Sequence, residues 1–370
     1  MDASSTDRLL RLRARMAETG TDLVALGPTS HMRWLSGVDP HGDERPVMLL
    51  VSARHAGLLM PALNAEAARQ ATDLPFELWD DAEGPDAALG RLLGACGTGP
   101  GAAVAVDEAM RADFALLLLD ALDAPRRSFL EATVGHLRAR KDAGEAERLR
   151  ASARANDRAF EAGWAALRPG VTEREVAAAI AAAHEAQGAR TAFGIVAFGA
   201  NAAFPHHHSG ETRLADGMAV LIDAGCRLDG YPSDMTRCAW FGAEPDGEWL
   251  HVAEVVEAAA RAGVAAAVPG ARAFDVDRAA RAVIEAAGYG DRFVHRTGHG
   301  IGVDVHEPPW ITATSETVLE EGMAFSVEPG IYLPGRFGVR LEDVVILEVG
   351  TARVLSGAPR PAQARSQSAP

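Results

Sequence analysis

Two stretches of ten residues repeat one another: Asp216–Gly225 reads DGMAVLIDAG, and Glu321–Gly330 reads EGMAFSVEPG. When the two are aligned, Asp223 falls on Glu328, and each acid ends a short apolar run just before a glycine. Short apolar runs bounded by glycine are typical of buried strands that end in a turn. The repeat therefore predicts a duplicated strand unit in which each copy delivers one carboxylate at the end of a strand.

A second acid follows each copy of the repeat. Asp234 lies in YPSDMTR, and Glu342 and Asp343 lie in the strand-like run GVRLEDVVIL, where whichever of the two points inward is a buried charge that needs a partner. His299, in HRTGHGIG, lies between the two copies. A single acid at a strand end is usually a turn residue, but two matching acids in two repeats need another explanation. Four buried carboxylates repel one another unless cations neutralise them, so this pattern predicts a site for two divalent metal ions.

The duplication extends beyond these strands. Residues 169–188, PGVTEREVAAAIAAAHEAQG, align without gaps with residues 269–288, PGARAFDVDRAARAVIEAAG. Each segment is predicted to be a helix that follows a Pro-Gly turn and closes on a C-terminal glycine. Each half is thus expected to run helix, helix, strands, and the halves are expected to pair about a pseudo-two-fold axis. The site would then lie at their junction, where pockets are favoured.

Length and composition bound the class of protein. The chain has 370 residues, of which 48% are hydrophobic and 24% charged, which is enough for two ordinary globular domains. Its net charge of −15, without a long basic stretch, argues against nucleic acid or an anionic membrane as a partner. No stretch approaches the roughly 18 consecutive apolar residues of a membrane span, and the N-terminus lacks the apolar core of a signal peptide. Because the three cysteines form no disulfide framework, a cytoplasmic protein is predicted.

Three regions are predicted along the chain. Residues 1–135 alternate helix-like and strand-like segments and form an α/β domain. A charged segment near residues 136–145 opens a long alanine-rich helix, and with it a second, α+β domain over residues 136–356 that contains the duplication. Residues 357–370 belong to a stretch rich in Pro, Ser and Ala with few apolar residues, and they are predicted to be a disordered tail.

Histidines supply further polar chemistry. His295, His299 and His306 lie in FVHRTGHGIGVDVHEPP, whose glycines permit close backbone approach around His299. A glycine-rich loop is often a phosphate cradle, but this one lacks the P-loop lysine and the Rossmann spacing. The histidine run 206–208 follows FGANAAFP, and we expect one of its members to face the site while the rest do not.

In these segments the chain resembles the pita-bread metallopeptidases, a family that includes proline-specific aminopeptidases, prolidases, methionine aminopeptidase and creatinase. The resemblance covers essentially the whole chain, including a creatinase-type N-terminal domain, and it implies the pita-bread fold for the second domain. In that family five metal ligands follow the order Asp, Asp, His, Glu, Glu. The order is complete here, as Asp223, Asp234, His299, Glu328 and Glu342.

The resemblance also implies roles for residues around the metal ions. Catalytic roles fall to His206, His306 and Glu328, of which Glu328 would move a proton to the leaving nitrogen. Substrate-binding roles fall to His295 and Arg340. The sequence departs from the family at TSHMRWLSGV, which replaces a segment that usually contains asparagine and tyrosine. This departure affects the choice of substrate and leaves the metal ligands intact.

The ligand set indicates the metal and the chemistry. Five ligands with a single nitrogen make a hard, oxygen-rich site, which favours Mn²⁺, with Co²⁺, Zn²⁺ and Fe²⁺ as alternatives. The resemblance implies that two such ions support hydrolysis of Xaa-Pro bonds at the N-terminus of peptides or in dipeptides. Two other readings stay open: a metal-dependent hydrolase or lyase acting on a small non-peptide substrate, as in creatinase or ectoine hydrolase, and a metal-free binding module. The complete ligand set disfavours the last of these.

The N-terminal domain carries no metal-binding pattern. In relatives it packs over an active site, often that of a second subunit, and closed two-fold dimers are the commonest oligomers. The resemblance therefore implies a homodimer in which residues 31–41, HMRWLSGVDPH, lie near the pocket. Trp34 and Arg33 are predicted to face the substrate, because an aromatic ring and a guanidinium suit an apolar ring and a carboxylate. The alternative is that Trp34 is a core residue.

Overall fold

The chain divides into two compact units, Met1–Arg138 and Ala139–Pro370. The structure is a computed structural model, and it describes residues 3–40, 42–242, 244–359 and 364–365. Of the predicted disordered tail, residues 360–363 and 366–370 lie outside this description, as does residue 41 of the predicted pocket segment. No helix within the described ranges is long and apolar enough to cross a lipid bilayer.

The N-terminal unit is built on a mixed sheet of six strands in the order β4-β3-β2-β1-β5-β6. The central strands β1, β2 and β3 are buried at every position and apolar except for Ser52, as expected of a sheet that is covered on both faces. Its elements are α1 (Ala3–Thr19), β1 (Leu23–Leu26), α2 (Ser30–Ser36), β2 (Met48–Ser52), β3 (Ala56–Pro61), α3 (Ala65–Arg69), β4 (Phe76–Trp79), α4 (Asp86–Cys96), β5 (Ala103–Val106), α5 (Ala112–Asp120), β6 (Arg126–Phe129) and α6 (Val134–Ala139). The predicted α/β character of this region is confirmed.

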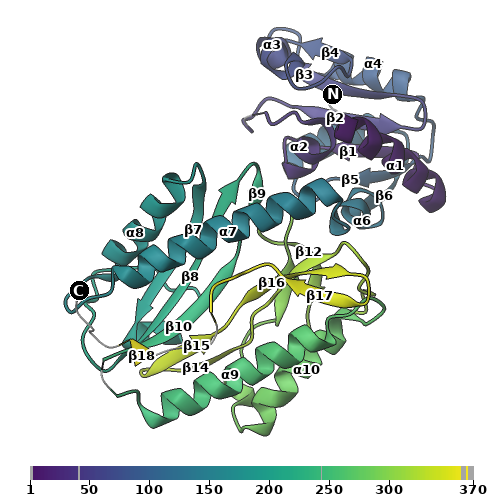
Figure 1. Ribbon diagram of the computed structural model, residues 1–370. Coiled ribbons are helices and arrows are strands. Elements are labelled where there is room, and N and C mark those ends of the chain that lie inside the picture. The colour runs from purple at the N-terminus through teal and green to yellow at the C-terminus, as the bar shows by residue number, and fades with distance from the viewer. Residues whose placement is uncertain (1–2, 41, 243, 360–363, 366–370) are drawn as a thin grey trace. The chain divides into compact units, whose positions relative to one another are not determined.

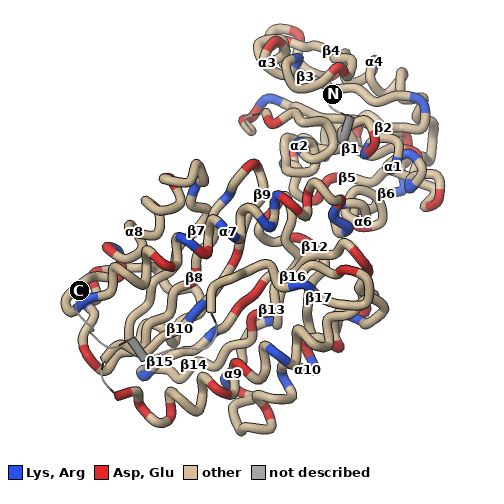
Figure 2. Tube along the Cα trace, in the orientation of Figure 1, with Lys and Arg blue, Asp and Glu red and all other residues tan. Residues whose placement is uncertain are grey.

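The first half of the C-terminal unit is a helix pair packed on an antiparallel sheet (Figure 1). The helix α7 carries acidic and basic side chains along its length, as Figure 2 shows, while the strands beneath it are mostly apolar. The elements are α7 (Ala143–Ala165), α8 (Glu173–Glu185), β7 (Arg190–Phe198), β8 (Met218–Leu228), β9 (Tyr231–Pro232) and β10 (Met235–Phe241). A short strand, β18 (Ala364–Arg365), pairs in parallel with β10.

The second half repeats this plan. Its elements are α9 (Gly247–Ala266), α10 (Ala273–Ala286), β11 (Gly298–Gly300), β12 (Glu307–Ile311), β13 (Ala324–Val327), β14 (Gly330–Leu333), β15 (Phe337–Arg340), β16 (Asp343–Glu348) and β17 (Thr351–Val354). The main sheet has the order β12-β11-β13-β16-β17, and β14 and β15 form a separate hairpin. The predicted pita-bread plan of two helix-and-strand halves is confirmed.

Matching glycines frame the second helix of each half. Gly170 before α8 and Gly270 before α10 have φ angles of 79° and 92°, and Gly188 and Gly288 after these helices have φ angles of 72° and 84°. A residue with a side chain is strained in this left-handed region, whereas glycine enters it freely. The same turn chemistry at the same four places explains why both helices begin and end where the sequence predicted.

The two faces of β8 serve different cores. Val220 and Ile222 belong to the core under α7 and α8. Leu221, on the opposite face, packs with Ile331 and Leu341 of the second half. Because side chains alternate along a strand, Asp223 falls on the face that meets the second half.

Candidate metal centre

Asp223 lies within β8 and does not end it. The strand continues to Leu228, so the prediction that this acid closes the strand is wrong. The glycine that suggested a turn has another use: a side chain at Gly225 would lie 2.1 Å from the backbone oxygen of Ser233. Gly225 therefore lets the segment before β10 pass close to β8, which brings Asp234 near Asp223.

Asp223 and its partner on β10 point the same way. Thr236 is the register partner of Asp223 in the antiparallel β8–β10 pair, and directly opposite residues share a face. The hydroxyl of Thr236 donates to Glu342 Oε2 at 2.8 Å, and the Glu342 N–H donates to the Thr236 carbonyl at 3.1 Å. Thr236 thus joins the first half to the acid that follows β15.

The sequence left open whether Glu342 or Asp343 points inward. Both are buried, and they diverge. Glu342 contacts the acid cluster, whereas Asp343 accepts a hydrogen bond from Arg237 Nη2 at 2.7 Å. Alternation along the chain after β15 thus gives one acid to the cluster and the other to a buried ion pair.

Glu328 and His299 are held by one serine. Ser326 Oγ donates to Glu328 Oε1 at 3.0 Å and accepts the His299 N–H at 3.0 Å. The Glu328 N–H donates to the Thr297 carbonyl at 2.8 Å. A side chain at Gly298 would lie 1.9 Å from the Ser326 carbonyl oxygen, so β11 can approach β13 this closely only through glycine.

The imidazole of His299 presents Nε2 to the acids. Its Nδ1 lies 3.1 Å from the Gly300 carbonyl oxygen, which can only accept, so Nδ1 carries the proton. Nε2 lies 3.3 Å from Glu328 Oε1 and 3.6 Å from Asp234 Oδ2. A neutral imidazole oriented through a carbonyl at Nδ1 is a common arrangement for a metal ligand.

The five predicted ligands meet in overlapping groups. Ligand atoms within 4.8 Å of one another come from Asp223, Asp234 and Glu342 in one group, and from His299, Glu328 and Glu342 in another. Glu342 belongs to both groups. Two neighbouring cation positions that share a carboxylate fit this arrangement.

The pKa values of the clustered acids also indicate a cation site. Burial raises the pKa of Asp234 well above its ordinary value, and the charges of Asp223 and Glu328 raise it further. Burial also raises the pKa of Glu328 to about 7, and burial with the Asp234 charge raises that of Glu342. Asp223 Oδ1 is buried and has no hydrogen-bond partner among the described residues. Such a cluster is costly by itself, and divalent cations remove the cost.

Arg340 is buried against this cluster. Its Nη2 donates to Asp223 Oδ2 at 2.7 Å, its Nε to Thr236 Oγ1 at 3.0 Å and its Nη1 to the Tyr332 hydroxyl at 2.8 Å. These bonds orient Asp223, one of the predicted ligands. The predicted role of Arg340 in substrate binding stays a prediction, and the sequence did not reveal Thr236 or Tyr332 as its partners.

His295 completes this chain of contacts. Its Nδ1 lies 2.7 Å from the Arg296 carbonyl oxygen and therefore donates, so its Nε2 accepts from the Tyr332 hydroxyl at 2.8 Å. Burial lowers the pKa of His295 to about 4, which keeps the ring neutral. With both nitrogens bonded, His295 offers the predicted substrate site its ring surface.

The histidine run 206–208 points in different directions. His207 Nε2 lies 2.8 Å from Glu173 Oε2, a buried acid at the start of α8. His206 lies on the side of His295 and His306, because its charge contributes to the lowered pKa of both, after burial and nearby arginines. The His306 ring is exposed and lies 4.0 Å from the His299 ring, edge to face. Of the run, His206 is thus the member that acts on His295 and His306, and its catalytic role stays a prediction.

Glu173 was not singled out by the sequence. It accepts hydrogen bonds from Phe198 N–H, Asn201 Nδ2 and Gly210 N–H at 2.8–2.9 Å, besides its contact with His207. One buried carboxylate therefore fixes the loop that carries His206. Nothing in the local sequence distinguishes it from an ordinary acid in the first turn of a helix.

Trp34 and Arg33 lie on α2 of the N-terminal unit. Trp34 is 3% exposed, and the guanidinium of Arg8 lies 4.7 Å from the centroid of its ring. Arg33 Nη1 lies 3.3 Å from Asp39 Oδ2. The burial of Trp34 fits the alternative of a core residue, and the assignment of Arg33 to substrate binding stays a prediction.

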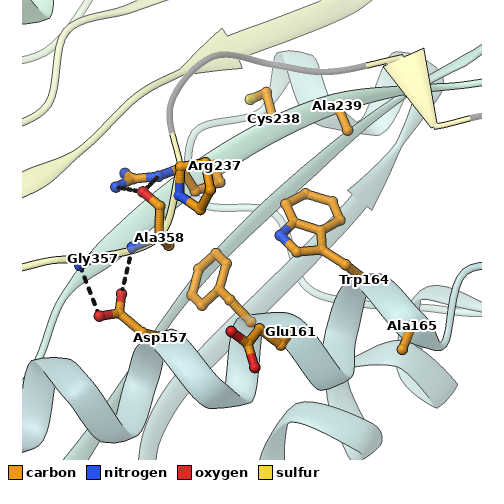
Figure 3. A pocket seen from close by; sticks show the side chains of 11 residues that line it. Asp157, Glu161, Trp164, Ala165, Arg237, Cys238, Ala239, Gly357 and Ala358 are labelled. Carbon is orange, nitrogen blue, oxygen red and sulfur yellow. Dashed lines mark hydrogen bonds between the residues drawn. The ribbon is translucent and has the colours of Figure 1, made fainter.

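A separate cavity of about 480 Å³ lies between α7 and the Gly357–Ala358 segment (Figure 3). Its wall includes Arg237, whose Nη1 donates to the Glu342 carbonyl at 2.6 Å, while the neighbouring Thr236 contacts the Glu342 side chain. Asp157 on α7 accepts the N–H groups of Gly357 and Ala358. The cavity contains none of the five ligands and lies behind the cluster.

The sequence of this chain is similar to those of known proteins over nearly its whole length. Residues 147–348 match the profile of "Metallopeptidase family M24", and residues 8–140 match that of the "Creatinase/Prolidase N-terminal domain". The "Probable dipeptidase PepE" of Mycobacterium tuberculosis is 38% identical over 347 residues, which span 92% of this chain and 91% of the relative. The "Xaa-Pro dipeptidase" of Pyrococcus furiosus is 31% identical over 95% of this chain and 97% of its own.

Solved structures agree. The dipeptidase PepE from Mycobacterium ulcerans superimposes with a TM-score of 0.93 at 36% identity, covering 99% of each chain. The recombinant prolidase from Thermococcus sibiricus gives a TM-score of 0.90 at 32% identity, covering 99% of this chain and all of that one. With its acid cluster, its duplicated fold and these matches over nearly its whole length, the chain belongs to metallopeptidase family M24.

Proposed function

We propose that this peptidase uses two divalent metal ions to cleave the bond between an N-terminal residue and a following proline. The observation that carries the proposal is the meeting of the five predicted ligands in two groups that share Glu342, with the His306 ring against that of His299. The names of the relatives, dipeptidase and Xaa-Pro dipeptidase, support the choice of substrate.

The ligands divide between the two halves of the C-terminal unit. Asp223 would help to hold one ion, His299 and Glu328 the other, and Asp234 and Glu342 would contribute to both. When bound, the ions lower the pKa of water and polarise the scissile carbonyl. The hard ligand set favours Mn²⁺ or Co²⁺.

The remaining roles fall to side chains around the ligands. Glu328 moves a proton from the attacking water to the leaving nitrogen, since a carboxylate beside the reacting atoms can accept and return it. His206 and His306 bind the substrate carbonyl and stabilise the negative charge that develops on its oxygen. The nitrogen of an Xaa-Pro bond has no N–H, so the proline is recognised by shape and apolar contact, to which the His295 ring contributes.

The proposal extends to assembly and location. A homodimer in which Arg33 and Trp34 lie near the pocket would let the N-terminal unit limit which peptides enter. A cytoplasmic location suits the three buried, unpaired cysteines, Cys96, Cys226 and Cys238. Light scattering tests the dimer, and an unchanged KM in Arg33→Ala would contradict the pocket assignment.

A substrate panel tests the reaction. We expect the protein, stripped with a chelator and reloaded with Mn²⁺, to cleave Ala-Pro and to leave Ala-Ala largely intact. The stripped protein should be inactive. Equal rates on the two dipeptides would refute proline selectivity, and full activity after exhaustive chelation would refute the metal dependence. Cleavage of neither peptide by the loaded protein would favour a small non-peptide substrate.

A further inference from the structure

Lys141 is the one lysine of the chain, among 36 lysine and arginine residues. It lies two residues before α7, and its side chain is 1% exposed. Its Nζ donates to Glu307 Oε1 at 2.8 Å and to the Ala139 carbonyl at 3.4 Å, and the Glu307 side chain is itself 5% exposed. At every other basic position the chain has arginine, whose guanidinium is larger and planar. This buried ion pair is therefore the one place where the chain uses a compact ammonium.

Glu307 lies against the turn that connects β11 to β12, residues 301–306. Its Oε2 accepts the Asp304 N–H at 3.3 Å. A side chain at Gly302 would lie 2.3 Å from its Oε1, so the turn can approach the carboxylate this closely only through glycine. Because the same Oε1 accepts from Lys141, the ion pair holds the carboxylate around which this turn is folded.

The turn presents one of the proposed substrate-binding histidines. His306 directly precedes Glu307, and its exposed ring lies 4.0 Å from that of His299. One of its ring nitrogens lies within 4.8 Å of ligand atoms of His299 and Asp234. Glu307 is also the register partner of Gly300, the residue after His299. The position of His306 beside the ligands thus depends on how Glu307 is held.

The segment that carries Lys141 is fixed to the second half of the C-terminal unit. The Lys141 N–H donates to the Gly322 carbonyl at 2.8 Å, and Arg140 forms an isolated antiparallel bridge with Met323. Arg140 Nε donates to Glu320 Oε2 at 3.0 Å. Lys141 is therefore anchored by its backbone as well as by its ammonium, so it can hold the turn in place.

We propose that Lys141 is a positioning residue, which through its buried ion pair with Glu307 holds residues 301–306 in the shape that places His306 beside the metal ligands. The inference rests on the proposed role of His306 in Xaa-Pro cleavage. Lys141 forms no hydrogen bond or ion pair with any of the five predicted ligands in the described part of the chain. Its loss should therefore lower kcat and leave metal binding unchanged.

The test uses three variants and a control. Lys141→Met removes the ammonium and keeps an unbranched side chain, and Lys141→Arg keeps the charge. Because Lys141→Met leaves a buried carboxylate unpaired, the double variant Lys141→Met/Glu307→Gln, which removes both charges, is compared with it. Arg140→Gln is the matched control, since it removes the neighbouring charge on the same segment, whose partner Glu320 is 50% exposed.

On the Mn²⁺-loaded protein, we expect Lys141→Met to lower kcat for Ala-Pro by about 10- to 100-fold, the range for a displaced group beside the reacting atoms. Metal content by mass spectrometry should not change. Lys141→Arg should recover part of the loss. The double variant should regain the urea midpoint of the wild type and keep the low kcat, and Arg140→Gln should stay within about 2-fold of the wild type.

Hydrogen–deuterium exchange measures the turn without turnover. In Lys141→Met and in the double variant, peptides that cover residues 301–307 should exchange at least about 10-fold faster than in the wild type, while β8 and β10 should not change. A purely structural role would instead speed exchange throughout the C-terminal unit.

A kinetic cycle shows whether Lys141 acts through His306. In a His306→Ala background, Lys141→Met should lower kcat by less than about 3-fold, because the group that it positions is already absent. Equal losses in the two backgrounds would overturn the inference. So would unchanged exchange at residues 301–307, or a double variant that regains kcat together with its stability.

The proposed reaction would fail in a different way. The wild type would then leave Ala-Pro intact, while Lys141→Met would still speed exchange at residues 301–307 and Arg140→Gln would not. That result would refute Xaa-Pro cleavage and support the hold of Lys141 on the turn.

Discussion

The two halves of the C-terminal unit reach the metal centre by different means. In the first half, Asp223 lies in the middle of a strand and Asp234 just before the next one. In the second half, Glu328 follows the end of the short strand β13, and Glu342 directly precedes β16 as Asp234 precedes β10. The halves therefore differ at the first acid, where aspartate projects from within a strand and the longer glutamate from just beyond one. A duplicated unit can thus keep an acid at the centre while its backbone position changes, provided that side-chain length compensates.

The halves are alike in how they position their histidines. A buried acid on α8, Glu173, fixes the loop that carries His206. A buried acid on α10, Asp277, accepts hydrogen bonds from the Thr297 N–H and hydroxyl, two residues before His299, and pairs with Arg281. These acids occupy different positions in the aligned helices. The support of the site was therefore built separately in each half.

The largest effect is expected from removing one ligand in either half. Asp234→Ala and Glu328→Ala should each lower kcat/KM by more than about 10³-fold, because the loss of a ligand also loses the ion that activates water. Metal content by mass spectrometry and Ala-Pro turnover measure the two consequences. Near-normal turnover with a full metal complement in Glu328→Ala would show that the second half does not supply this ligand.

Stability without metal sharpens this comparison. Asp234→Asn should be more stable than the wild type after chelation, because one of several mutually repelling buried carboxylates is gone. With Mn²⁺ the order should reverse, since only the wild type gains binding free energy. Urea unfolding midpoints with and without Mn²⁺ measure the difference. Asp216→Asn, at the exposed start of the repeat, is the control and should leave both midpoints unchanged.

A smaller effect is expected from the histidines. His206→Ala and His306→Ala should lower kcat by about 10²- to 10⁴-fold while the metal content stays close to that of the wild type. His208→Ala should be nearly silent, because its exposed side chain forms no hydrogen bond or ion pair among the described residues and does not act on His295 or His306. Equal and mild effects across the run 206–208 would show that it is a surface cluster.

Removing the charge of the buried acid Glu173 or Asp277 should affect the two halves differently. Glu173→Gln and Asp277→Asn should each lower the free energy of unfolding by about 3 kcal/mol, because donors are left without a charged acceptor in the interior. At temperatures where both variants are folded, Glu173→Gln should reduce kcat and keep metal affinity, whereas Asp277→Asn should weaken metal binding. Urea unfolding and metal titration distinguish these outcomes, and the reverse pattern would contradict the assignment of the two supports.

The smallest expected effect is on the pH dependence of the free energy of unfolding, and it arises from the first half alone. His184 on α8 is buried between Thr191 and Asn156, and the aligned residue on α10 is Ile284. Burial lowers the pKa of His184 to about 4 from an ordinary value near 6.5. The unfolded chain therefore binds more protons between these values, so this contribution is present above pH 6.5 and is lost as the pH falls toward 4.

Between pH 6.5 and 4, the protonation of His184 in the unfolded chain should lower the free energy of unfolding by at most about 3 kcal/mol. In His184→Gln, which keeps a polar group but does not titrate, the free energy of unfolding should fall less between pH 6.5 and 4.5. Urea midpoints across this range measure the difference. Parallel pH profiles for the two proteins would exclude His184 as the source.

Repetition made most of the fold and the clustering of the predicted ligands accessible from the sequence. Two copies of a strand segment and two copies of a helix segment indicate equivalent elements without any knowledge of their contacts, and they pointed to Asp223 and Glu328 together. Contacts between distant segments were not accessible. His207 contacts Glu173, which lies 34 positions earlier in the chain. Arg340 contacts Asp223, which lies 117 positions earlier, so local sequence could not reveal either contact.

The position of Asp223 within β8 was mistaken for a physical reason. A glycine after an apolar run usually marks a turn, and at Gly225 it marks the close passage of a neighbouring backbone. Local sequence does not distinguish these uses, because both require the absence of a side chain. The same ambiguity applies to Gly298, where β11 approaches β13.

The division of the predicted ligands between the two halves has a consequence for biosynthesis. Asp223 and Asp234 leave the ribosome more than a hundred residues before Glu342, which both ligand groups of the centre include. A nascent chain that has made only the first half lacks His299, Glu328 and Glu342, so it could not hold the proposed pair of ions. On the proposed mechanism, metal capture waits for nearly the whole duplication, and we expect a chain interrupted before residue 342 to be inert.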